Sequence, residues 1–127
     1  MAVIIKDGKI LLMRRIKNGR EYFVFPGGGV KNDENLEDGV IREIKEEFDL
    51  GIKINKLLFQ IENQGREEFY FLVKEFTGLP KISGEEKERM NINNQYYPIW
   101  LELFEIAKIP NLYPEEAKKK LEKLIKK

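Results

Sequence analysis

The most constraining feature of this sequence is the segment around Pro26, where a short apolar run stops and a helix-forming run follows. Residues 22–25 read as a strand, and Pro26 with the glycines at 27–29 ends that strand abruptly. Asn35 is a good helix N-cap, and acidic residues follow it in the first turn. The sequence therefore predicts a strand, a glycine-rich loop and a helix over residues 36–48.

The remaining segments mix strand and helix patterns without the strict alternation of a parallel sheet. Strands are predicted for residues 3–5, 10–14, 52–62, 67–77 and 96–101. A helix begins near Pro114, and its predicted buried stripe is Ala117, Leu121, Leu124 and Ile125. The polar run 78–94 is long for a loop. We expect an α+β fold, a mixed β-sheet sandwiched between helices, with residues 1–127 forming one domain.

Composition narrows the chemistry that this chain can perform. It has 127 residues and contains no cysteine and no histidine, which excludes disulfides, thiolate zinc sites and a histidine base. Its 23 basic and 22 acidic residues give a formal charge of +1, so nucleic acid is an unlikely partner. No apolar run reaches the length of a membrane span, and a cytoplasmic location is expected.

Acidic residues crowd one side of the predicted helix. At about 100° per residue, Val40, Ile44 and Phe48 form the apolar stripe, whereas Glu43, Glu46 and Glu47 share another arc of about 100°. Like charges at such spacing repel, and a hard divalent cation such as Mg²⁺ would turn that repulsion into binding. The alternative is a solvated acidic helix.

The same segment resembles the signature of the Nudix hydrolases, GX5EX7REUXEEXGU. Gly28, Glu34 and the run from Arg42 to Glu47 are in register, and Leu50 is apolar where the pattern requires it. Asp49 replaces the glycine that normally ends the helix, and Asp tolerates the left-handed conformation better than most residues.

This resemblance implies a MutT-like Nudix fold, with a loop-helix-loop at the active site, that hydrolyses a nucleoside diphosphate linked to another group. The implied Mg²⁺ or Mn²⁺ ligands are Glu43, Glu46, Glu47 and the carbonyl of Gly27. Glu34 and Arg42 would orient those ligands. Glu43 is the first choice for the general base, and Glu86 or Glu88 of the 78–94 run is an alternative base or a further metal ligand.

The resemblance also implies where substrate would bind. Arg14 or Arg15 would reach phosphates, and strand alternation points only one of them toward the site. Gly28 and Gly29 would offer backbone groups, and Tyr96 could stack a base or belong to the core.

Substrate choice is open at this level. A nucleoside triphosphate is the expected substrate. The alternatives are ADP-ribose, a dinucleoside polyphosphate, an RNA end, or binding without cleavage in a nucleotide-sensing domain. Relatives are often homodimers, and nothing in the sequence identifies an interface.

Overall fold

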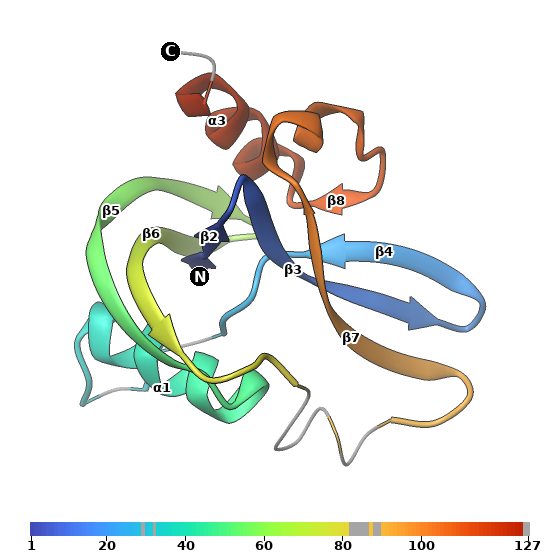
Figure 1. Cartoon of the computed structure of the whole chain (residues 1–127), viewed down its shortest axis with the longest axis horizontal. Helices are drawn as coiled ribbons and strands as arrows, with labels where there is room; N and C mark the ends of the chain where they lie inside the picture. Colours follow the sequence, from blue (N-terminus) through green and yellow to red (C-terminus); the bar gives the residue numbers. More distant parts are fainter. Residues whose placement is uncertain (29, 32, 82–86, 88–89, 126–127) are drawn as a thin grey trace.

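The computed structural model describes residues 1–28, 30–31, 33–81, 87 and 90–125. Figure 1 shows how the helices and strands are arranged. The elements, in chain order, are β1 (Ala2–Val3), β2 (Ile5–Lys6), β3 (Lys9–Lys17), β4 (Arg20–Val24), α1 (Leu36–Phe48), β5 (Gly51–Asn63), β6 (Arg66–Thr77), β7 (Asn94–Glu102), the 3-10 helix η1 (Leu103–Lys108), β8 (Leu112–Tyr113) and α3 (Glu115–Ile125). In these described residues, none of the helices has the length and apolar character needed to span a membrane.

The strands form two hydrogen-bonded sheets of mixed direction. One has the order β1-β6-β5, and in the other β3 lies between β7 and β4, with β8 beyond β4 and β2 at the start of β3. The pairs β1–β6 and β4–β8 are parallel, and the other pairs are antiparallel. The expectation of an α+β fold with a mixed sheet is confirmed.

Tight two-residue turns set the register of these hairpins. Asp7-Gly8, Asn18-Gly19 and Gln64-Gly65 all have positive φ at both residues, with values from 51° to 79°. This conformation matches the twist of antiparallel strands, and Asp, Asn and Gly tolerate it best. Asp7-Gly8 and Asn18-Gly19 are residue pairs typical of such turns, and the strands predicted at 52–62 and 67–77 pair as the β5–β6 hairpin.

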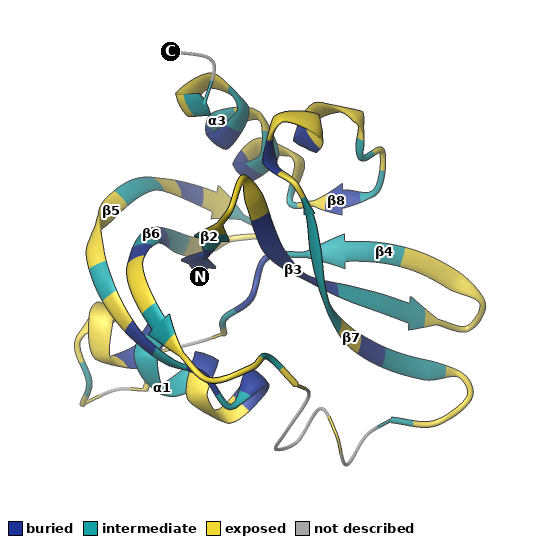
Figure 2. Cartoon of the chain, in the orientation of Figure 1, coloured by how far each residue is buried: buried dark blue, intermediate teal, exposed yellow. Residues whose placement is uncertain are grey.

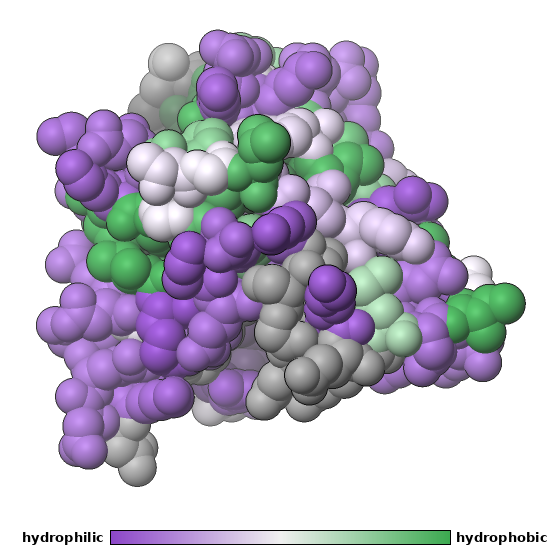
Figure 3. Space-filling model, turned by 60° about the horizontal axis from the view of Figure 1, so that its bottom comes forward, coloured by the Kyte–Doolittle hydropathy of each residue, from purple (hydrophilic) through white to green (hydrophobic). Residues whose placement is uncertain are grey.

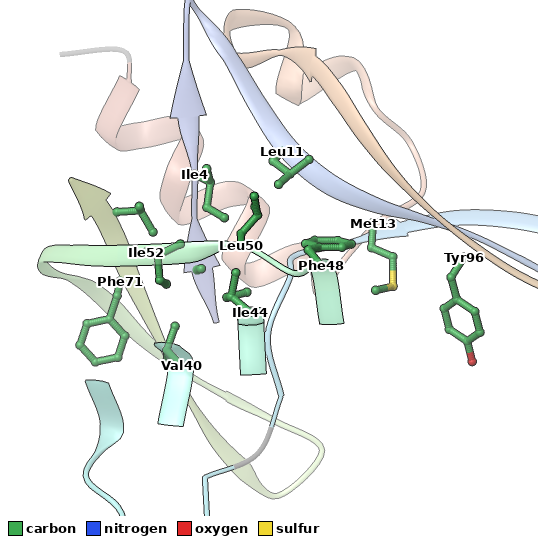
Figure 4. Close-up of a cluster of buried hydrophobic side chains, with 12 residues drawn as sticks. Ile4, Leu11, Met13, Val40, Ile44, Phe48, Leu50, Ile52, Phe71 and Tyr96 are labelled. Carbon is green, nitrogen blue, oxygen red and sulfur yellow. The ribbon is translucent and has the colours of Figure 1, made fainter. Parts of the chain in front are cut away.

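Strand β3 separates two apolar clusters. Its Leu11 and Met13 pack with Ile44 and Phe48 of α1, as Figure 4 shows. Ile10 and Leu12, on the opposite face of β3, pack in a second cluster that includes residues of η1 and α3. In Figure 2 the buried part of β3 lies in the middle of the molecule, while the end of the β3–β4 hairpin is exposed.

Three details of the sequence reading differ from the structure. η1 and β8 were not anticipated, because a six-residue helix and a two-residue strand are too short to carry a periodic pattern. Leu124 was expected in the buried stripe of α3, but it is 40% exposed. Ala117 and Leu121 are buried, so the stripe that holds α3 to the core is narrower than predicted.

Candidate active site

Helix α1 is held by a cap at each end. The side chain of Asn35 accepts a hydrogen bond from the Asp38 backbone N–H at 2.8 Å. At the other end Asp49 adopts the left-handed conformation, with φ 55°, and its N–H donates to the Lys45 carbonyl. The predicted bounds of 36–48 are confirmed, and the C-terminal turn that a glycine would make is made by Asp49.

Arg42 contacts acidic side chains on the side of α1 that carries Glu43, Glu46 and Glu47, which we call the acidic arc. Its Nη2 lies 2.7 Å from Oε1 of Glu34, and its Nη1 lies 2.9 Å from Oε1 of Glu43 and 3.1 Å from Oε2 of Glu46. One guanidinium therefore joins the loop before α1 to two carboxylates on the helix. The five donors of a guanidinium permit this shared bonding.

The charges of this network stabilise one another. Hydrogen bonds from Arg42, and then from the Lys31 backbone N–H, lower the pKa of Glu34 to about 2. The same contact with Glu34 raises the pKa of Arg42 above its ordinary value. Both groups consequently remain charged across the physiological range.

The helix glutamates differ in their surroundings. Glu47 is buried at 4% exposure, whereas the side chains of Glu43 and Glu46 are 21% and 55% exposed. In the part of the chain that the structure describes, no three acidic side chains converge as ligands around one point. Arg42 acts as the positive counter-charge for Glu43 and Glu46.

The donor set nevertheless fits a hard cation. Every candidate ligand is an oxygen, and a carboxylate offers about four lone-pair sites, so one contact with Arg42 does not use it up. Gly28 has no side chain, and a Cβ at that position would lie only 2.6 Å from Oε2 of Glu43. The glycine therefore lets a carboxylate approach the loop backbone closely.

Gly39 makes a similar close approach possible one turn earlier. An added Cβ would lie 2.9 Å from Cγ2 of Val30 and 3.2 Å from Oε1 of Glu34. Val30 and Glu34 of the loop before α1 thus occupy the space beside Gly39. Gly39 thus positions Glu34 for its contact with Arg42.

A pocket of about 340 Å³ lies beside this arrangement. Gly27 and Gly28 line it together with Val40 of α1 and residues at the start of β6, among them Arg66 and Glu68. Figure 3, which turns the bottom of Figure 1 forward, shows mostly hydrophilic side chains over its lower left, the side where α1 lies. The sequence reading did not select Glu68, because a charged residue near a strand end has no distinguishing pattern.

The structure places the two candidate arginines of β3 on opposite faces. Arg14 pairs with Glu21 at 2.6 Å on the face away from α1. Arg15 continues the alternation of Leu11 and Met13, and its Nη2 donates to the hydroxyl of Tyr96 at 2.9 Å.

Tyr96 is 6% exposed and belongs to the cluster around α1. Figure 4 shows it at the margin of that cluster, beyond Met13. The remaining candidates Gly29, Glu86 and Glu88 lie outside the described residues.

Comparison with known proteins places this geometry in a family. The family model described as the NUDIX domain matches residues 1–121. The chain is 38% identical over 86 residues to the ADP-ribose pyrophosphatase of Methanocaldococcus jannaschii, covering 67% of this chain and 51% of that protein. It is 32% identical over 85 residues to a MutT-like protein of Streptomyces ambofaciens, covering 65% and 54%.

A solved structure supports the same placement. The E. coli ORF135 protein superimposes with a TM-score of 0.74 at 26% identity, covering 98% of this chain and 84% of that one. The matched part of this chain spans about half the length of the two curated relatives. The family model, the identity and the fold agree, and the chain belongs to the Nudix hydrolase family.

Proposed function

We propose that this protein is a metal-dependent hydrolase that cleaves the phosphoric anhydride of a nucleoside diphosphate linked to another group. The observation that carries the proposal is the network in which Arg42 joins Glu34, Glu43 and Glu46 beside the glycine loop. Membership of the Nudix family supports it.

The proposed metal ligands are Glu43, Glu46, Glu47 and the carbonyl of Gly27, and the proposed metal is Mg²⁺ or Mn²⁺. When bound, such a cation would neutralise phosphate charge and lower the pKa of a coordinated water. Arg42 and Glu34 would hold the carboxylates in place, as partners of metal ligands commonly do.

Glu43 is the proposed general base. It would accept the proton of the attacking water while the water oxygen bonds to phosphorus and the bond to the leaving phosphate oxygen breaks. Its Oε2 faces the Gly28 backbone, where no side chain intervenes. Arg15, which lies on the α1 side of β3, is the proposed phosphate contact in preference to Arg14.

A nucleoside triphosphate is the first candidate substrate, as for MutT-like members of the family. ADP-ribose is the second candidate, because the M. jannaschii relative is named as an ADP-ribose pyrophosphatase and is 38% identical over the matched region.

The experiment is a release assay for phosphate and pyrophosphate, run with Mg²⁺ and with a chelator in its place. The panel holds nucleoside triphosphates, ADP-ribose, sugar nucleotides and dinucleoside polyphosphates. We expect turnover of one group, lost on chelation. Binding of these nucleotides in Mg²⁺ without any cleavage would contradict hydrolysis and support a sensing role.

A further inference from the structure

The pocket beside the glycine loop has a carboxylate in its wall that the proposed reaction does not use. This carboxylate belongs to Glu68 of β6, and Gly27 and Gly28 line the same pocket. Gly28 is also the glycine that lies close to Oε2 of Glu43, and Figure 1 shows the loop that contains it running from β4 to α1. A group bound in this pocket would therefore lie next to the proposed site of hydrolysis.

Two neighbouring side chains hold the Glu68 carboxylate in place. The hydroxyl of Tyr70 donates to Oε1 at 2.9 Å, and Nδ2 of Asn63 donates to Oε2 at 3.3 Å. A carboxylate has about four lone-pair sites, so each oxygen can accept one more hydrogen bond. Because Glu68 is half-buried in the wall of the pocket, this capacity is available to a ligand there.

The ring of Tyr70 fixes this carboxylate relative to the glycine loop. Tyr70 is fully buried, and its ring centre lies 4.8 Å from that of Phe59, in a stack, and 5.3 Å from that of Phe25, edge to face. Phe25 directly precedes Pro26 and the loop. Burial, and then the charge of Glu68, raise the pKa of the Tyr70 hydroxyl, so this group stays protonated and donates. Glu68 is thus a preorganised acceptor.

The rest of the pocket suits a sugar better than a phosphate. Its volume of about 340 Å³ is within the range of sites that hold small ligands, roughly 300–1,000 Å³. Arg66 and Glu67 line it with opposite charges, and both are exposed. The negative charge of Glu68 repels a phosphate, whereas the hydroxyls of a sugar can donate to it. The C–H groups of a sugar would pack on the apolar side chains of the wall, which include Val30, Leu36, Val40, Phe69 and Phe71.

We infer that Glu68 is a specificity-determining residue, which accepts hydrogen bonds from the neighbouring hydroxyls of a ribose bound in this pocket. The inference rests on the proposed function and narrows its substrate class to compounds that carry a ribose rather than a deoxyribose. Two parts of a substrate can supply such a sugar. One is the nucleoside, and the other is the terminal sugar of a compound such as ADP-ribose.

The test uses two pairs of compounds, each of which differs by one hydroxyl. ATP is paired with 2′-deoxy-ATP, and ADP-ribose is paired with its analogue that has a terminal 2-deoxyribose. We expect wild type in Mg²⁺ to prefer the ribose form of one pair by about tenfold in kcat/KM, because the deoxy form loses a hydrogen bond to a charged group. The pair that shows the preference identifies which ribose lies in the pocket.

Glu68→Gln is the decisive variant. Its side chain keeps one oxygen for the Tyr70 hydroxyl and replaces the other with an NH₂ group that accepts no hydrogen bond. We expect the preference for ribose to fall to about twofold. Glu62→Gln is the matched control, because Glu62 is an exposed glutamate of the same β5–β6 hairpin that does not line the pocket. The control should keep the preference of wild type.

Tyr70→Phe keeps the test decisive even if Glu68→Gln does not fold. It removes the hydroxyl that holds Glu68 and leaves the carboxylate, so the preference should fall to about threefold to fivefold. A thermal scan of each variant separates specificity from stability. If Glu68 only supported the fold, its variant would lose turnover of both members of a pair equally and would keep the preference.

Binding of the four compounds, measured with a chelator in place of Mg²⁺, separates this inference from hydrolysis. A preference for ribose that Glu68→Gln reduces, without turnover in Mg²⁺, would support the role of Glu68 and contradict the proposed hydrolysis. Equal affinity of wild type for both members of each pair, or a preference that is unchanged in Glu68→Gln, would overturn the role of Glu68 even if the protein hydrolyses these compounds.

Discussion

Gly28 shows how one missing side chain shapes the candidate site. A Cβ added there would meet Oε2 of Glu43 at 2.6 Å, so Gly28→Ala must displace that carboxylate. The carboxylate is the end of a flexible side chain, and we expect little change in Tm. We expect turnover to fall about tenfold to a hundredfold, as when a metal ligand loses its position. Steady-state kinetics and a thermal scan measure both effects.

Gly51→Ala is the matched control. Its added Cβ would lie 2.9 Å from Oγ1 of Thr77, which is also a side-chain atom but is not one of the acidic residues of α1. Gly51→Ala should keep wild-type turnover. Equal losses in both variants would mean that crowding a glycine, rather than moving Glu43, lowers the activity.

Glu34 gives the protein a specific dependence on acid. Its pKa is about 2 when folded, against an ordinary value of 4.5. A lowered pKa stabilises the fold fully above the ordinary value, and this contribution is lost as the pH falls from about 4.5 through about 2. We therefore expect the Tm advantage of wild type over Glu34→Gln to shrink across this window. A difference in Tm that stays constant down to pH 2 would contradict the role of the Arg42 contact.

The C-terminal end of α1 is where the sequence departs from the family signature, because Asp49 stands where the signature has glycine. Asp49 adopts φ 55° and pairs with Lys45 at 2.8 Å and Lys81 at 3.5 Å. Asp49→Ala and Asp49→Gly both lose these ion pairs. The difference between their free energies of unfolding therefore reports how well each residue tolerates the left-handed backbone conformation. We expect the glycine variant to be more stable than the alanine variant by about 1 kcal/mol in urea unfolding. Equal stabilities would mean that the left-handed turn is not kept.

The sequence was sufficient to predict the helices and strands that carry a strong local pattern. Helix α1 begins and ends at the predicted residues because Asn35 caps it and its apolar stripe is unbroken. Two of the three tight turns have residue pairs that favour positive φ, Asp7-Gly8 and Asn18-Gly19. β8 was missed because two residues have no period, and Leu124 was misplaced because tertiary packing, not the stripe, decides how far a helix end is covered.

For the candidate site, the sequence predicted which residues share one side of α1 but not the contacts between them. Spacing placed Glu43 and Glu46 on one side of the helix, and the resemblance implied only that Arg42 would orient the metal ligands. In the structure Arg42 contacts both of them and Glu34 as well, which depends on how the loop folds back onto Gly39. The choice of Arg15 over Arg14 likewise required the register of β3 against the rest of the sheet.

Within the whole molecule, helix α1 packs on the sheets through its apolar stripe. Ile44 is fully buried in the cluster that β3 contributes to. We expect Ile44→Ala to lower the free energy of unfolding by about 2–5 kcal/mol, because it removes packed atoms and leaves a cavity. Leu124→Ala, at a position that is 40% exposed, should change it by less than about 1 kcal/mol. Denaturant unfolding of both variants checks the ranking, and a larger loss in Leu124→Ala would contradict the assignment of the core.

The carboxylates of α1 are the proposed site of hydrolysis, and the most direct test of this proposal is the turnover of Glu46→Gln beside wild type in saturating Mg²⁺. The Glu46 side chain is 55% exposed and its contact with Arg42 is a surface ion pair, so Tm should change little. We expect turnover of the substrate found in the release assay to fall by about a hundredfold or more. Wild-type turnover in a folded Glu46→Gln protein would contradict the assignment of hydrolysis to these carboxylates.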